Sequence, residues 1–60
     1  MEYRFYFLGP DCRVYGRREF HADNDGAAIE MAWTIFRTAP VPHHGFELWQ
    51  EKRHVHTEGC

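Results

Sequence analysis

Aromatic residues occupy alternate positions in the segment 3–8, YRFYFL. Tyr3, Phe5 and Phe7 fall on one face of this segment, because successive side chains of a strand point to opposite faces. A short run this rich in aromatic residues predicts a β-strand. The next four residues, GPDC at 9–12, include three strong turn formers and predict a tight turn.

A second strand is predicted over residues 13–21, RVYGRREFH. Gly16 interrupts it, and a glycine inside a strand often marks a β-bulge. Because the connection between the two predicted strands is short, we expect them to pair as an antiparallel hairpin.

The segment 21–37, HADNDGAAIEMAWTIFR, contains the spacing of an amphipathic helix of about thirteen residues. Asp23 is the best candidate for the N-cap, because its carboxylate can accept from free backbone N–H groups of the first turn. Asp25 adds negative charge where the helix dipole favours it. We expect the helix to end before Pro40, whose ring disfavours helical geometry in the preceding residue. The apolar positions on one side are Ala28, Ile29, Ala32, Trp33, Ile35 and Phe36.

The C-terminal part predicts a second hairpin, with strands over 46–50 and 53–57 and the turn at Glu51 and Lys52. Glu-Lys is not a preferred sequence for a two-residue hairpin turn, so a shift of one residue stays open. The predicted cross-strand pairs are Gln50 with Arg53, Trp49 with His54, Leu48 with Val55, and Glu47 with His56.

These elements predict one α+β domain over residues 1–60 with the order ββαββ. The simplest assembly is a four-stranded antiparallel sheet in the order 2-1-3-4, with the helix packed on one face and making a right-handed crossover. The expected core residues are Tyr3, Phe5, Phe7, Val14, Phe20, Ile29, Ala32, Trp33, Phe36, Phe46, Leu48 and Val55.

Composition narrows the function classes. A chain of 60 residues buries only about 60% of the surface that its unfolded form exposes, so a small domain of this kind often gains stability by oligomerisation. A net charge of −2 makes a nucleic-acid binder unlikely, since such proteins carry a basic excess. No apolar run approaches the ~20 residues that span a bilayer, so we expect no membrane partner.

The chain has two cysteines, Cys12 in the first turn and Cys60 at the last position. A disulfide-rich secreted domain would carry more, and the first ten residues do not have the pattern of a signal peptide. We therefore expect two free thiols and a cytoplasmic location.

The segments YRFYFL, F-x-A-D-x-D-x-x-A-I-x-x-A and FELWQ-x-x-R-x-V resemble a group of very short, uncharacterised proteins of rhizobia and related alphaproteobacteria, a domain of unknown function. The resemblance covers nearly the whole chain, and its most specific parts are 3–8, 20–32 and 46–55. It implies a bacterial cytoplasmic protein and supports the fold. It implies no catalytic residues and does not extend to the C-terminal histidines.

The histidines of the second hairpin allow two interpretations. In the predicted pairing, Glu47, His54 and His56 share one face, and two imidazoles with a carboxylate are a reasonable ligand set for zinc, which His44 or Cys60 could complete. Alternatively, this is a solvated edge strand whose polar side chains discourage pairing with other sheets. We expect the second, and no cofactor.

A single helix cannot cover both faces of a four-stranded sheet. The uncovered face would carry Tyr6, Tyr15 and Trp49, and an open aromatic patch is typical of an interaction site. A deep substrate pocket is not expected in such a fold, so we expect no enzyme. The sequence therefore predicts a small interaction module that forms a homodimer through this face, or that binds another protein. Binding of single-stranded nucleic acid to the aromatic face is a weaker alternative.

Overall fold

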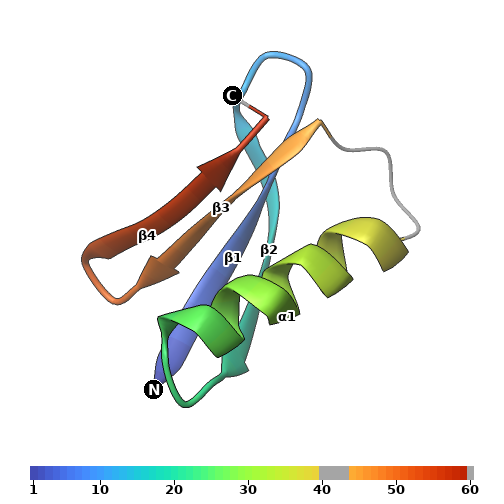
Figure 1. Ribbon diagram of the computed structural model, residues 1–60. Helices are drawn as coiled ribbons and strands as arrows, with labels where there is room; N and C mark the ends of the chain where they lie inside the picture. Colours follow the sequence, from blue (N-terminus) through green and yellow to red (C-terminus); the bar gives the residue numbers. More distant parts are fainter. Residues whose placement is uncertain (40–43, 60) are drawn as a thin grey trace.

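The computed structural model describes residues 1–39 and 44–59. Four strands form one antiparallel sheet in the order β2-β1-β3-β4, and the single helix α1 packs against one face, which confirms the predicted α+β fold (Figure 1). In the described part of the chain, no helix is long and apolar enough to cross a membrane. The elements are β1 (Glu2–Leu8), β2 (Val14–His21), α1 (Asp25–Thr38), β3 (Gly45–Gln50) and β4 (Arg53–Glu58).

The core lies between α1 and the two central strands. Phe46 of β3 is fully buried at its centre and stacks on Phe5 of β1, with ring centroids 5.0 Å apart. Trp33 of α1 meets the Phe46 ring edge-on at 5.3 Å. Ala28 and Ala32 are also fully buried, because two small side chains let the helix backbone approach the sheet closely.

Two core assignments differ from the prediction. Val14 was expected in the core but is 53% exposed, because it lies beside the turn of the β1–β2 hairpin, at the end of the sheet. Leu8 was not expected in the core, because it falls on the opposite face of the predicted strand from Tyr3, Phe5 and Phe7, but it is only 1% exposed. A bulge in β2 leaves Tyr15 without a partner residue on β1. The bulge lies directly beside Gly16, the residue predicted to interrupt this strand.

The helix begins one residue later than predicted. Asn24, and not Asp23, is the N-cap: its backbone is extended, and its side-chain oxygen accepts from the N–H of Ala27 at 2.8 Å. Asp25 is therefore the first helical residue. The helix ends at Thr38, before Pro40 as expected, and the N–H of Ala39 closes the last turn on the carbonyl of Ile35.

The expectation of a free thiol at Cys12 is wrong, because Cys12 is disulfide-bonded. The sequence contains one other cysteine, Cys60, which lies outside the described residues. Cys12 itself adopts a positive φ of 63° in the β1–β2 turn. The free-thiol argument for a reducing compartment therefore does not hold.

Candidate interaction surface

The face of the sheet opposite α1, called the open face below, has no covering element among residues 1–39 and 44–59 (Figure 1). Side chains alternate between the two faces of a strand, so the residues between the buried core positions point to this side. The open face comprises Arg4, Tyr6, Arg17, Glu19, Glu47, Trp49, His54 and Thr57.

One half of the open face is built around Arg4 on β1. Arg4 lies opposite Glu19 of β2, and its Nε is 3.4 Å from the Glu19 carboxylate. A hydrogen bond to Tyr6 is the main reason why the pKa of Arg4 is raised, and the nearby charge of Glu19 adds to it. The half-buried Tyr6 ring therefore lies next to a cation that Glu19 also contacts.

The other half is built around Trp49 on β3. Its indole N–H donates to the carboxylate of Glu47 at 3.1 Å, and the His54 ring meets the indole edge-on, with centroids 5.1 Å apart. The Nε2 atom of the His54 ring contacts the hydroxyl of Thr57. Trp49 is thus held by polar neighbours on both sides, with its ring half-buried on the open face.

The three residues of the predicted metal site do not converge. Trp49 lies opposite His54 as predicted, but a bulge at Val55 shifts the rest of the strand, so that Leu48 faces His56 and Glu47 faces Thr57. The predicted Glu47–His56 pairing is therefore wrong. His56 turns toward α1, where its ring centroid lies 5.7 Å from that of Phe46, while His54 stays on the open face.

Within the described ranges, no group of three His, Cys, Asp or Glu side chains is arranged to hold a metal ion. His56 instead contacts Glu58 at 3.2 Å on the helix side of β4. His44, considered as a fourth ligand, is exposed, and its backbone N–H donates to the carbonyl of Leu8. Cys60 lies outside the described residues.

Of the three predicted surface aromatics, Tyr6 and Trp49 lie on the open face and Tyr15 does not join them. Tyr15 follows the bulge at the end of the hairpin, where its ring lies 6.2 Å from that of the core residue Phe7. It borders a shallow depression of about 440 Å³ at the β1–β2 turn, with Gly9, Pro10, Asp11 and Arg13. The bulge could not be placed to the residue from Gly16 alone.

The pair His54 and Thr57 places an imidazole nitrogen against a hydroxyl, the first requirement of an activated nucleophile. The remaining requirements are not met by the described residues. Among the described residues, no carboxylate or carbonyl is bonded to Nδ1 of His54, and neither residue lines the depressions at Tyr15, at Glu51 or at Ile35. The pair therefore has a positioning role for β4 and gives no argument for catalysis.

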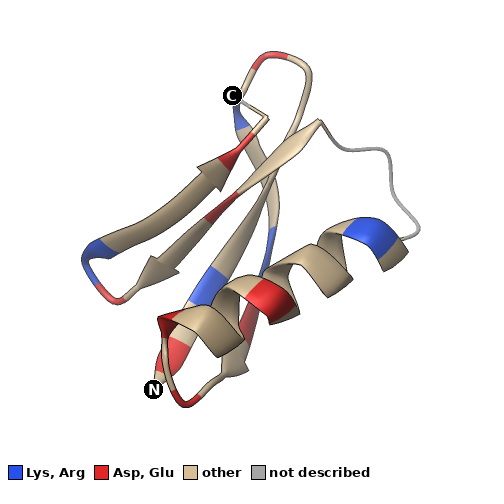
Figure 2. Cartoon of the chain, viewed as in Figure 1, with Lys and Arg blue, Asp and Glu red and all other residues tan. Residues whose placement is uncertain are grey.

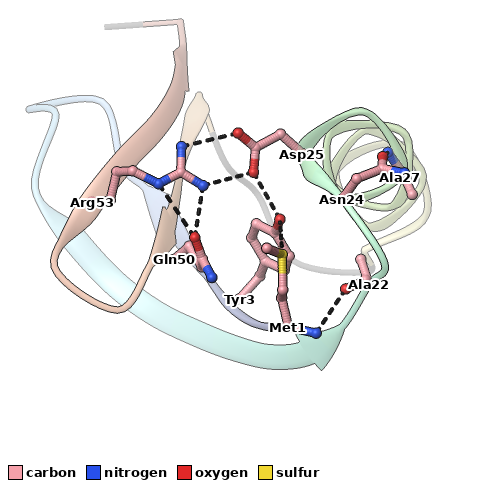
Figure 3. A network of polar contacts seen from close by, with 8 residues as sticks. All are labelled: Met1, Tyr3, Ala22, Asn24, Asp25, Ala27, Gln50 and Arg53. Carbon is pink, nitrogen blue, oxygen red and sulfur yellow. Dashed lines mark hydrogen bonds and ion pairs between the residues drawn. The ribbon is translucent and has the colours of Figure 1, made fainter.

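A polar network that the sequence did not predict ties the helix start to the sheet (Figure 3). Arg53 donates to both carboxylate oxygens of Asp25, at 2.9 and 2.8 Å, and the buried Tyr3 hydroxyl donates to the same carboxylate at 2.7 Å. Gln50 accepts from Arg53 at 2.7 Å. The only signal in the sequence is Tyr3 itself, since a buried tyrosine hydroxyl usually finds a partner.

The hydrogen bonds from Arg53, and then that from Tyr3, lower the pKa of Asp25 to about 2. The same bond to Asp25 raises the pKa of Arg53, and burial is the main reason why the pKa of Tyr3 is raised. Both carboxylate oxygens are engaged inside the chain. The network therefore stabilises the fold and does not form a ligand site.

Comparison with protein-family models, with curated proteins and with solved structures gives no match for this chain. The resemblance to short proteins of alphaproteobacteria stays a prediction. The function is therefore argued from the open face alone.

Proposed function

We propose that this chain is a non-enzymatic interaction module that forms a homodimer through the open face of its sheet. The observation that carries the proposal is the position of Tyr6 and Trp49 on a sheet face that α1 does not cover. Both rings are half-buried and held in place by neighbouring polar groups. Rigid aromatic side chains of this kind are the usual anchors of protein interfaces.

The charges on the open face favour a second copy over a polyanion. Two basic residues, Arg4 and Arg17, are matched there by the acidic Glu19 and Glu47. Figure 2 shows acidic and basic positions interspersed over the strands, without a basic stripe. A nucleic-acid surface needs an excess of cations, whereas a balanced face can complement itself across a two-fold axis.

The size of the face sets a limit on how a dimer can form. The molecule extends over 30 × 23 × 15 Å, so the projected area of the sheet face is at most roughly 690 Å². A standard interface buries about 800 Å² per partner. A face-to-face dimer would therefore use nearly the whole open face, and removal of its largest anchor would have a large effect.

The test is Trp49→Ala, with Met31→Ala as the matched control. Met31 is also large and apolar, but it is 45% exposed on α1, away from the sheet. We expect Trp49→Ala to weaken self-association about thirtyfold, the effect of losing an anchor worth about 2 kcal/mol, with Met31→Ala unchanged. Sedimentation equilibrium or native mass spectrometry measures the subunit number, and far-ultraviolet circular dichroism checks the fold.

A second variant keeps the test decisive if Trp49→Ala does not fold. Thr57→Arg places a long charged side chain on the open face and leaves the Trp49 side chain itself unchanged. A wild-type chain that stays monomeric at about 100 μM, or a dimer unaffected by either change, would sink the proposal. Capture of a different protein by the same face would replace the second copy with another partner.

No metal function is proposed, because Glu47, His54 and His56 do not share a face. Only the resemblance supports a bacterial cytoplasmic setting. The disulfide bond of Cys12 does not support it, because disulfides are typical of oxidising compartments. The dimer proposal depends on neither location.

A further inference from the structure

The outer edge of β2 is a second candidate surface. β2 pairs only with β1 among the described strands, and its pairing runs without interruption from His21 to Gly16. The opposite edge strand, β4, is broken near its middle by the bulge at Val55. Bulges hinder edge pairing, whereas a regular edge leaves a row of N–H and C=O groups free to pair. β2 is therefore the better template for an added strand.

The hydrogen-bond pattern shows which groups of β2 point outward. Met1 and Ala22 exchange two backbone bonds, Ala22 N–H to Met1 O at 3.0 Å and the Met1 amine to Ala22 O at 2.9 Å. Bonded and non-bonded pairs alternate along an antiparallel ladder. Phe20, Arg18 and Gly16 therefore bond to β1, and the backbone groups of Arg17 and Glu19 point to the open edge.

A two-fold axis perpendicular to the sheet allows three central registers for two paired copies of β2. An axis at Arg17 places Arg17 opposite Arg17 of the second copy, and an axis at Glu19 does the same for Glu19. In both registers, like charges lie directly opposite one another. An axis at Arg18 sets Arg17 opposite Glu19 of the second copy, twice. Both residues of each such pair have outward backbone groups, so each pair exchanges two hydrogen bonds.

The same register also fits on the helix side of the sheet. Phe20, which is half-buried, would lie over Gly16 of the second copy, where an aromatic ring covers the exposed backbone of a strand glycine. Arg18 would meet its own copy, which costs energy. Its guanidinium, however, lies 6.0 Å from the Phe7 ring centroid and borders Ile35 and Thr38, which directs the charge toward α1 and away from the axis.

We infer that a second copy of this chain pairs antiparallel with β2 about Arg18, and so joins two four-stranded sheets into one of eight strands. The inference goes beyond the proposed function and does not depend on it, because the two copies join edge to edge through backbone hydrogen bonds of β2 and do not stack on the open face. Where both interfaces form and their two-fold axes intersect at right angles, the assembly closes at four chains.

The first test is residue-resolved amide hydrogen exchange at low and high protein concentration. When about nine tenths of the chains are paired, only the free tenth exchanges, so the amides of Arg17 and Glu19 should exchange about tenfold more slowly. The amides of Arg18 and Phe20 are matched controls, because they bond to β1 at every concentration. A face-to-face dimer alone leaves Arg17 and Glu19 fast, and that result would overturn the edge inference without touching the proposed function.

The second test exchanges charge between copies. Arg17→Glu and Glu19→Arg each set like charges opposite one another, so neither variant should pair through β2 with itself. Mixed together, they should form a heterodimer, which native mass spectrometry identifies by its mass. Both variants are made in the Trp49→Ala background, so that the open face does not contribute. Self-association of either variant at the level of its Trp49→Ala parent, or no preference for the mixed pair, contradicts the inference.

Discussion

Gly45 gives the sharpest test of the close approach between the start of β3 and the end of β4. It begins β3, opposite Leu8 of β1, and a Cβ added to it would lie 2.1 Å from the backbone oxygen of Glu58 at the end of β4. An ordinary contact requires about 3.4 Å or more. In Gly45→Ala the strand ends would therefore have to separate by roughly 1.3 Å, and the obstacle is backbone, which cannot rotate away.

The cost of this change can be set against the stability of the whole domain. Overpacking of a well-packed site costs about 1–3 kcal/mol, and a rigid backbone neighbour places Gly45→Ala near the upper end. A domain of 60 residues has roughly 3–9 kcal/mol of stability in total. With a urea m-value of about 1 kcal/mol/M, we expect the unfolding midpoint to fall by about 3 M.

Gly26→Ala is the matched control, because it is the same chemical change with the opposite expected sign. Gly26 lies in the first turn of α1, where an added Cβ would meet only the Asn24 side chain at 3.3 Å. Alanine favours the helix, so stability should rise by about 0.5 kcal/mol. Urea unfolding followed by circular dichroism measures both variants. A Gly45→Ala midpoint equal to that of the wild type would refute the close approach of β3 and the end of β4.

Two further predictions concern the start of the helix. Asn24→Ala should cost about 1 kcal/mol of stability, the usual value of an N-cap, whereas Asp23→Ala should change it by less than about 0.5 kcal/mol; urea unfolding of the two variants would return the reverse order if Asp23 were the cap. The Asp25 carboxyl has a folded pKa of about 2, below its ordinary 3.8, so its stabilising effect is complete above pH 3.8 and is lost as the pH falls toward 2. In Asp25→Asn the melting temperature should depend less on pH over this acidic range. A melting temperature that falls with pH as steeply as in the wild type would contradict the role of the network.

The fold was predictable because periodicity and turn chemistry agree along the chain. The alternating aromatics of β1, the helical spacing around Ala28 and Ala32 and the strand pair around Trp49 each specify one element. Strand order then follows from short connections and from the handedness of the crossover. The four-stranded sheet with one helix needed no information beyond these patterns.

The errors of the prediction arise where one extra residue in a strand moves the side chains that follow it to the other face of the sheet. A bulge at Val55 moves His56 from the open face to the helix side, because side chains alternate with a period of two. The sequence RHVHT alternates without a glycine or proline that would mark the bulge. The bulge removes the alternative metal site in this way, and Tyr15 was misplaced by the second bulge.

The Asp25 network shows a different limit. An acidic residue at the start of a helix is already explained by the helix dipole. The sequence therefore gives no reason to expect that Asp25 also bonds to Arg53, 28 positions away. Asp23 and Asn24 are both good cap residues, and only the direction in which the chain enters the helix decides between them. Contacts of this kind depend on how the β3–β4 turn sits beside the helix, which no local pattern specifies.

The accessible surface of the chain bears on how its variants can be interpreted. It is 4024 Å², close to the roughly 4,100 Å² expected for a folded monomer of 7.2 kDa. The single chain is therefore about as compact as an ordinary monomer, and its core residues Phe5 and Phe46 are buried without help from a second copy. Self-association through the open face or the β2 edge would add to a fold that already exists. It follows that Trp49→Ala and Glu19→Arg should both yield folded chains, so that a loss of assembly can be separated from a loss of structure.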